Sequence, residues 1–332
     1  MINAYFVFPL IGKCKFCIDK GGSGDFLIRQ FKNYLIKLEK QENVTPMDKS
    51  IELYNTNIIK ILQEYTNEEF FLSRKLYGEK NFLNGMGIHF QLSESRIRLT
   101  RQEEKGGISW LKKIYHTFLG ADELMRYNNY SRNFSLNFLI PLFSVYASCY
   151  GFFCIHGSCI HIHRKNILLT GLDGVGKSTL ASLLCENDGE ILADNIVLFD
   201  GTNALNFNLA MRVDPHLETK YKMLYSGRDF KEILPNKTDA GAVKVDAVYN
   251  LIKIKKTQAM KMERYHGDMT SWILYMNGAP EINQINAVIS PWRFYHNLVF
   301  KESNCRNELD ICNFYIPEGK LSDAKEELLK WV

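Results

Sequence analysis

The clearest hydrophobic pattern lies in the middle of the chain. Residues 167–170 form a short apolar run that predicts a buried strand. Residues 177–186 carry Leu180, Leu183 and Leu184 at helical spacing and predict a helix. The glycine-rich segment between them predicts a tight loop. The pattern therefore gives the order strand, glycine loop, helix.

The segments on either side of this unit are also apolar. Residues 154–163 predict a strand that forms a hairpin with 167–170 through a polar turn at 164–166. Residues 189–200 predict a further pair of buried strands, interrupted by Asp194. A buried carboxylate is costly unless it meets a cation or hydrogen-bond donors. Asp194 is therefore a candidate site residue.

The N-terminal region, about residues 1–130, has a mixed pattern. We expect a strand at 4–11, a helix at 25–40 and a hairpin within 87–100. It carries no motif, so it is a separate α+β region of unknown role.

The C-terminal part, residues 131–332, holds the glycine loop and forms the second predicted domain. Beyond the loop region we expect a strand at 245–255 and a helix at 323–331 with Ser322 as its N-cap. Residues 136–155 lack charged side chains and are long enough to span a bilayer. Their polar residues, Pro141 and Gly151 favour instead a buried helix that ends near 151 and leads into a strand.

Composition fits a globular protein with two cores. The chain has 332 residues, of which 46% are hydrophobic and 23% charged. A net charge of +4 is too small to indicate a nucleic-acid partner. Eight cysteines without a framework pattern favour a reducing compartment, and the apolar start lacks the flanks of a signal peptide. We therefore expect a cytoplasmic protein without a membrane span.

The loop sequence carries the strongest chemical signal. Residues 171–178 fit the phosphate-binding motif G-x-x-x-x-G-K-[ST]. Glycines let backbone N–H groups approach a polyphosphate, and the helix N-terminus adds a partial positive charge. Lys177 is expected at the β- and γ-phosphates and Ser178 at Mg²⁺. The predicted nucleotide-binding residues are Gly171, Asp173, Gly174, Val175, Gly176, Lys177, Ser178 and Thr179.

Several weaker signals have plainer interpretations. Residues 236–239 match the guanine-reading N-K-x-D, but no D-x-x-G lies between the glycine loop and this segment, and Pro235 makes 231–235 a poor buried strand. Cys14 and Cys17 form a C-x-x-C without a second pair, so two strand cysteines are favoured over zinc. Further weak candidates are a metal set of Cys159, His161 and His163, a phosphate-neutralising arginine at Arg212 or Arg264, and a steering role for the basic residues Lys256, Lys261 and Arg264.

Three motifs together resemble the HPr kinase/phosphorylase family, including its homologues found with lasso-peptide biosynthesis. The matching segments are 155–158 (Ile-His-Gly-Ser), 171–179, and 192–194 (Leu-Ala-Asp). They cover roughly 50 residues, and the likeness is faint beyond them. The family has a second Asp where this chain has Asn195, so the metal site and catalysis depart from its pattern.

The resemblance implies an α/β fold: a P-loop kinase domain of HPr-kinase/PEP-carboxykinase-like type, preceded by the smaller α+β region. It implies an enzyme that uses ATP and Mg²⁺ to phosphorylate a hydroxyl, expected to be a serine of a peptide or protein. Asp194 would be the general base, His156 would orient it, and Lys177 would neutralise phosphate charge. Ser178, Asp194 and Asn195 would hold the metal.

Two alternatives stay open. One is a small-molecule or nucleotide kinase on the same fold, because the sequence does not identify the acceptor. The other is an ATP-binding sensor with weak catalysis, which Asn195 makes plausible. Phosphorolysis and self-association into a homo-oligomer also stay open.

Overall fold

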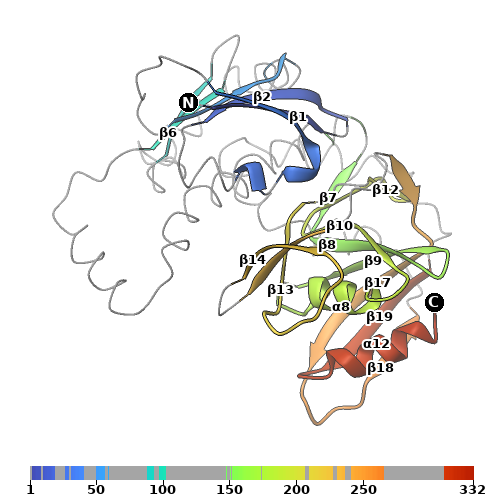
Figure 1. Ribbon diagram of the computed structural model, residues 1–332. Helices are drawn as coiled ribbons and strands as arrows, with labels where there is room; N and C mark the ends of the chain where they lie inside the picture. The colour runs from blue at the N-terminus through green and yellow to red at the C-terminus, as the bar shows by residue number, and fades with distance from the viewer. Residues whose placement is uncertain are drawn as a thin grey trace, which may run out of the picture. The chain divides into compact units, whose positions relative to one another are not determined.

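The structure is a computed structural model that describes residues 2–8, 10–18, 27–29, 31–40, 50–56, 59, 88–92, 97–101, 147, 150, 152–172, 174–205, 209–226, 230–235, 241–264 and 310–332. These residues form two compact units, one up to residue 101 and the other from Ala147 onward (Figure 1). The predicted domain boundary near residue 130 lies outside the described residues.

The N-terminal unit is a six-stranded antiparallel sheet with the order β3-β1-β2-β4-β6-β5. Its core is aromatic, since Phe6 contacts Phe16 with ring centroids 5.3 Å apart and Phe8 contacts Phe31 at 5.2 Å. The predicted strand at 4–11 and hairpin within 87–100 are confirmed as β1 and β5–β6. The strands are β1 (Ile2–Phe8), β2 (Gly12–Ile18), β3 (Leu35–Lys40), β4 (Ser50–Tyr54), β5 (Ile88–Leu92) and β6 (Ile97–Arg101).

The predicted helix at 25–40 is wrong in its second half. Residues 27–29 are helical and Lys32–Tyr34 form a short 3-10 helix (η1), but Leu35–Lys40 are strand β3. Leu27, Phe31 and Tyr34 have helical spacing and are buried. Beyond them, pairing of β3 with β1 satisfies the backbone in an extended form, and this tertiary pairing overrides the helical period.

The second unit is built on a mixed six-stranded sheet with the order β10-β8-β9-β17-β19-β18. β9, β17 and β19 run parallel, whereas β8 is antiparallel to β9, β10 to β8 and β18 to β19. Helices α8 (Lys177–Leu184) and α12 (Leu321–Leu329) pack together on one face (Figure 1). The strands are β8 (Gly157–Ile162), β9 (Lys165–Gly171), β10 (Glu190–Asp194), β17 (Ala247–Ile254), β18 (Lys261–Arg264) and β19 (Asp310–Pro317).

Two smaller antiparallel sheets complete this unit. One has the order β16-β12-β11-β7 and packs on the sheet face opposite the helices; the other has the order β13-β15-β14 and packs beside α8. Both faces of the central sheet are therefore apolar, as expected for its parallel strands. The strands are β7 (Phe153–Ile155), β11 (Val197–Phe199), β12 (Asn203–Leu205), β13 (Met211–Val213), β14 (Lys222–Ser226), β15 (Lys231–Leu234) and β16 (Ala242–Lys244).

Most predicted elements of this unit are confirmed. The strand at 167–170, the helix from Lys177, the strand pair around Asp194 and the strand at 245–255 are present as β9, α8, β10–β11 and β17. The hairpin turn is shifted to His163 and Arg164, whose positive φ values of 48° and 65° are those of a type I′ turn.

Two local predictions are wrong. Ser322 is not the N-cap of the C-terminal helix, because α12 begins at Leu321 after Lys320, which makes no side-chain cap. Residues 231–234 are a good buried strand: β15 is the central strand of its sheet, with Ile233 fully buried. Pro235 follows the last strand residue, so it removes no ladder hydrogen bond.

The apolar run 136–155 is described only in part. Ala147 is helical and β7 begins at Phe153, as predicted for its end, while residues 136–146 lie outside the described residues. Within the described ranges, no helix combines the length and hydrophobicity needed to cross a membrane. The structure is thus a mixed α/β protein with few described helices.

Candidate functional site

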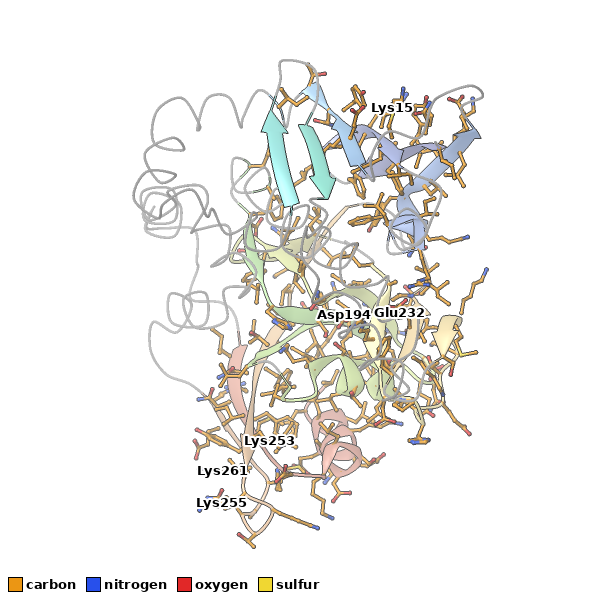
Figure 2. The ribbon with its side chains drawn as sticks, turned by 90° about the vertical axis from the view of Figure 1, so that its left-hand side faces the viewer. Lys15, Asp194, Glu232, Lys253, Lys255 and Lys261 are labelled. Atoms are coloured by element: carbon orange, nitrogen blue, oxygen red, sulfur yellow. The ribbon has the colours of Figure 1, made fainter. Side chains whose placement is uncertain are left out.

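The site lies where three neighbouring strands reach one edge of the central sheet. β9 ends at Gly171, β10 ends at Asp194, and β8 begins at Gly157. Because β8 runs antiparallel to both neighbours, these ends lie at the same edge. Figure 2 shows Asp194 among these strands, above α8. The predicted residues on separate segments are thereby brought to one place.

The glycine loop needs its glycines for two physical reasons. Gly171, Gly174 and Gly176 have φ values of 138°, 75° and 100°, a region that L side chains rarely adopt. A Cβ at Gly171 would also lie 2.5 Å from the Leu251 carbonyl oxygen. Glycines at these positions therefore let the loop adopt these backbone conformations and let its first residue lie close to β17. Asp173 lies outside the described residues, Val175 is buried, and Thr179 is half-buried in α8.

Lys177 spans the base of this loop. Its ammonium group is buried and donates hydrogen bonds to the carbonyl oxygens of Gly171, at 2.9 Å, and Leu172, at 3.0 Å. The positive charge is thus held beside the loop at the start of α8, where the helix dipole also favours an anion.

Asp194 is buried and held from two sides. Ser158 Oγ on β8 donates to Oδ1 at 2.5 Å, and Ser178 Oγ on α8 donates to Oδ2 at 3.1 Å. Burial raises the pKa of Asp194 to about 6. The two serine hydroxyls, the backbone N–H of Asn195 and the charge of Lys177 oppose that rise, in this order. The carboxyl group is therefore ionised at neutral pH yet has the pKa of a usable base.

Asn195 turns the chain directly after Asp194. Its φ of 66° is in the left-handed region, which asparagine tolerates better than most residues. Its backbone N–H supports the ionised form of Asp194, and the residue is half-buried. The left-handed backbone conformation at this position therefore favours asparagine independently of any metal contact.

His156 lies in the break between β7 and β8. It is buried, with 9% of its surface exposed, and stands two residues before Ser158. The structure therefore places His156 near the strand ends that carry Asp194. Its orienting role stays a prediction.

Ser158 is a site residue that sequence reasoning left without a role. It is fully buried, and strand register sets it opposite Asp194. Its position inside the Ile-His-Gly-Ser segment was the one available signal.

The cysteine and histidine metal candidates are not brought together. Cys14 packs in the core, whereas Cys17 on the other face of β2 donates its S–H to Asn3 Oδ1 at 2.8 Å. Cys159 is buried, His161 Nδ1 pairs with Asn166 Oδ1 at 2.8 Å, and His163 is in the hairpin turn. Within the described residues no group of three or more His, Cys, Asp or Glu side chains could hold a metal ion.

Neither candidate arginine is held at the loop. Arg212 lies 3.5 Å from the buried carboxylate of Glu232 and stacks on Phe230 with its guanidinium 4.3 Å from the ring centroid. Arg264 is exposed on β18, three strands from β9 in the sheet order, or about 14 Å at about 4.8 Å per strand. The weak arginine predictions gain no support from these positions.

The structure changes the arguments for and against a guanine-reading N-K-x-D motif at 236–239. Residues 236–239 lie outside the described residues. β15, which precedes them, is a sound buried strand, but it belongs to a three-stranded antiparallel sheet and not to the sheet that carries the glycine loop. The poor-strand argument against a guanine-binding site therefore fails. The location of β15 outside the sheet that carries the glycine loop is a new argument against it.

The oxygen donors at the site suit Mg²⁺. Ser178 Oγ and Asp194 Oδ2 are 3.1 Å apart, so one ion could contact both. Asn195, the next residue after Asp194, adds a side-chain amide oxygen as a third possible ligand. Hydroxyl, carboxylate and amide oxygens are the hard ligands that Mg²⁺ prefers. The residues present therefore fit the expected metal.

Comparisons with known proteins add little. No family model and no curated protein sequence matches the chain. Among solved structures, the Hpr(Ser) kinase/phosphatase from Coxiella burnetii is similar, with 11% identity, a TM-score of 0.26, and coverage of 53% of this chain and 93% of that chain. This is a distant fold relationship at most.

Proposed function

We propose that this chain is an ATP-dependent kinase that transfers the γ-phosphate to a hydroxyl group, namely a serine of a peptide or protein. The observation that carries the proposal is the meeting of a glycine loop, a buried lysine and a buried carboxylate at one sheet edge. Lys177 and Asp194 come from different elements, and Ser178 joins them through its bond to Asp194 Oδ2.

The loop and Lys177 would bind the phosphates. At the three glycines no Cβ shields the backbone N–H groups of the loop and the first turn of α8. Lys177 already lies against the loop carbonyls and has only to redirect its ammonium group to a phosphate oxygen. Positioning and charge neutralisation of this kind dominate phosphoryl transfer.

Asp194 would accept the proton of the acceptor hydroxyl. A carboxylate with a pKa near 6 is ionised at pH 7 and is a stronger base than an exposed aspartate. His156 would orient Asp194. Mg²⁺, when bound by Ser178, Asp194 and Asn195, supplies neutralisation of phosphate charge.

Asn195 is the observation that favours a second candidate, an ATP sensor with little catalysis. Its amide oxygen can ligate a cation but carries no charge, so it would hold Mg²⁺ less strongly than a carboxylate does. An Asn195→Asp variant separates the two candidates, because it would gain transfer activity only if this position limits catalysis.

Phosphate transfer followed by mass spectrometry tests the proposal. Purified protein is incubated with Mg·ATP and a peptide and protein extract, beside Lys177→Ala and Asp194→Asn variants. Phosphate on serine with wild type, lost in both variants, supports the proposal and identifies the acceptor. Transfer to a free hydroxyl compound alone supports the small-molecule kinase. ATP binding without transfer across Mg²⁺ and Mn²⁺ concentrations supports the sensor.

A further inference from the structure

Among the described residues, Ser158 makes the shortest hydrogen bond to Asp194. Its hydroxyl lies 2.5 Å from Oδ1 and is completely buried, and the pairing of β8 with β10 sets the two residues opposite each other. An O–H···O⁻ distance of about 2.5–2.7 Å is typical of a charge-assisted hydrogen bond. The sheet itself therefore holds one oxygen of the carboxylate.

Oδ2, the other carboxylate oxygen of Asp194, accepts a longer hydrogen bond from a residue that has a second task. Ser178 reaches Oδ2 at 3.1 Å from α8, and Ser178 is also the residue that would ligate Mg²⁺ in the proposed function. A hydroxyl that turns to a metal no longer donates in the same direction to Asp194. Ser158 lies on β8 and not in the glycine-loop motif, so it is not one of the residues expected to hold Mg²⁺. Its bond can persist when that of Ser178 is lost.

We infer that Ser158 is a positioning residue: it holds Asp194 by Oδ1, so that Oδ2 alone stays directed toward α8 and the glycine loop while Ser178 changes partner. The inference rests on the proposed function. It assigns the two carboxylate oxygens different tasks, Oδ1 as the anchor and Oδ2 as the oxygen that faces the metal and the acceptor hydroxyl. Loss of the anchor would let the carboxyl plane rotate, which harms the transfer step and leaves the nucleotide contacts of Lys177 in place.

The kinetic test compares Ser158→Ala with Ser158→Thr and a matched control, Ser182→Ala. Ser182 is also buried beside the same sheet, on α8, and its Oγ has no hydrogen-bond partner within the part of the chain that the structure describes. Ser158→Ala is expected to lower kcat by roughly 10- to 100-fold with the KM for ATP within about twofold of wild type, as for a misplaced catalytic group. Ser158→Thr keeps the hydroxyl and should recover most of kcat, and Ser182→Ala should match wild type. An unchanged kcat in Ser158→Ala, or a rise in KM alone, would overturn the inference.

A spectroscopic test does not depend on activity. Infrared difference spectra of the carboxylate stretches, assigned to Asp194 by their loss in Asp194→Asn, report the hydrogen bonds that this carboxylate accepts. We expect the bands to shift in ligand-free Ser158→Ala and to stay at their wild-type positions in Ser182→Ala. Unshifted bands in Ser158→Ala would show that Ser158 does not hold Asp194. If wild type transfers no phosphate, the proposed function fails, and the band positions alone decide whether Ser158 anchors Asp194.

Discussion

Ser178 Oγ lies 3.1 Å from Asp194 Oδ2, although the two residues are 16 positions apart and belong to a helix and a strand. Ser178 is the last residue of the glycine-loop motif, and Asp194 ends the edge strand of the sheet. Their contact links the predicted phosphate-binding element to the predicted base.

Phosphate transfer should depend on pH through Asp194. Its pKa of about 6 means that the carboxylate is protonated below that pH and cannot accept the proton of an acceptor hydroxyl. The value of kcat/KM should therefore rise with pH up to about 6 and level off above it. A pH–rate profile between pH 5 and 9 measures this, with ATP affinity followed in parallel. A flat profile through this range would exclude Asp194 as the base.

Asp194→Asn should stabilise the fold at high pH. The folded-state pKa of about 6 is above the usual value for an unfolded aspartate, about 3.9, so the folded protein binds the proton more tightly. Stability is therefore lost as pH rises from about 4 through 6, and the loss approaches about 2–3 kcal/mol above that range. A neutral amide avoids this loss.

Urea unfolding at two pH values tests this prediction. At pH 8 the free energy of unfolding of Asp194→Asn should exceed that of wild type by up to about 2 kcal/mol. At pH 4, where Asp194 is protonated, the two should nearly coincide. A variant that is less stable than wild type at pH 8 would show that the hydrogen bonds of the carboxylate outweigh its desolvation.

The glycines of the loop should differ in how well they tolerate alanine. Gly171→Ala combines a φ of 138° with a Cβ only 2.5 Å from the Leu251 carbonyl oxygen, whereas a Cβ at Gly174 meets nothing within 4 Å. Gly174→Ala should cost about 1 kcal/mol from backbone strain alone, and Gly171→Ala at least about 2 kcal/mol more because backbone must move. Chemical denaturation of both variants measures the difference. Equal costs would mean that β9 and β17 separate easily at this point.

The sequence was most informative where a pattern is local. The strand, loop and helix of residues 167–184 follow from an apolar run, a glycine-rich segment, and helical leucine spacing, all within one short stretch. The contact of Ser158 with Asp194 could not be predicted in this way, because it depends on the register between two strands and joins residues 36 positions apart. The same cause explains the error at Leu35–Lys40, where pairing with β1 outweighs the helical spacing of Leu27, Phe31 and Tyr34.

Removal of divalent metal should leave the N-terminal unit unaffected. Cys14 and Cys17 face opposite sides of β2, and burial raises the pKa of the Cys14 thiol to about 12, which keeps it protonated and a poor metal ligand. Thermal unfolding with and without EDTA should therefore give the same midpoint for this unit. A fall of several degrees on chelation would show a structural metal.

Leu321, at the start of α12, supports the glycine loop. A Cβ added at Gly176 would lie 2.7 Å from Leu321 Cδ1, so the leucine side chain packs directly against the loop backbone. Leu321→Ala should leave a gap under the loop and weaken ATP binding several-fold, with a loss of about 1–3 kcal/mol in the free energy of unfolding for this partly buried side chain. Gly176→Ala should be worse, because φ strain and overlap with Leu321 act together.

The double variant decides whether the two positions interact. In Gly176→Ala/Leu321→Ala the overlap is relieved and only the strain remains, so the combined loss in unfolding free energy should be smaller than the sum of the single losses by about 1 kcal/mol. Calorimetric ATP titration and urea unfolding of the four proteins complete the cycle. Leu328→Ala, a fully buried change farther along the same helix, is the control: it should destabilise α12 without a specific coupling to Gly176. Strict additivity for Gly176 and Leu321 would show that α12 does not support the loop.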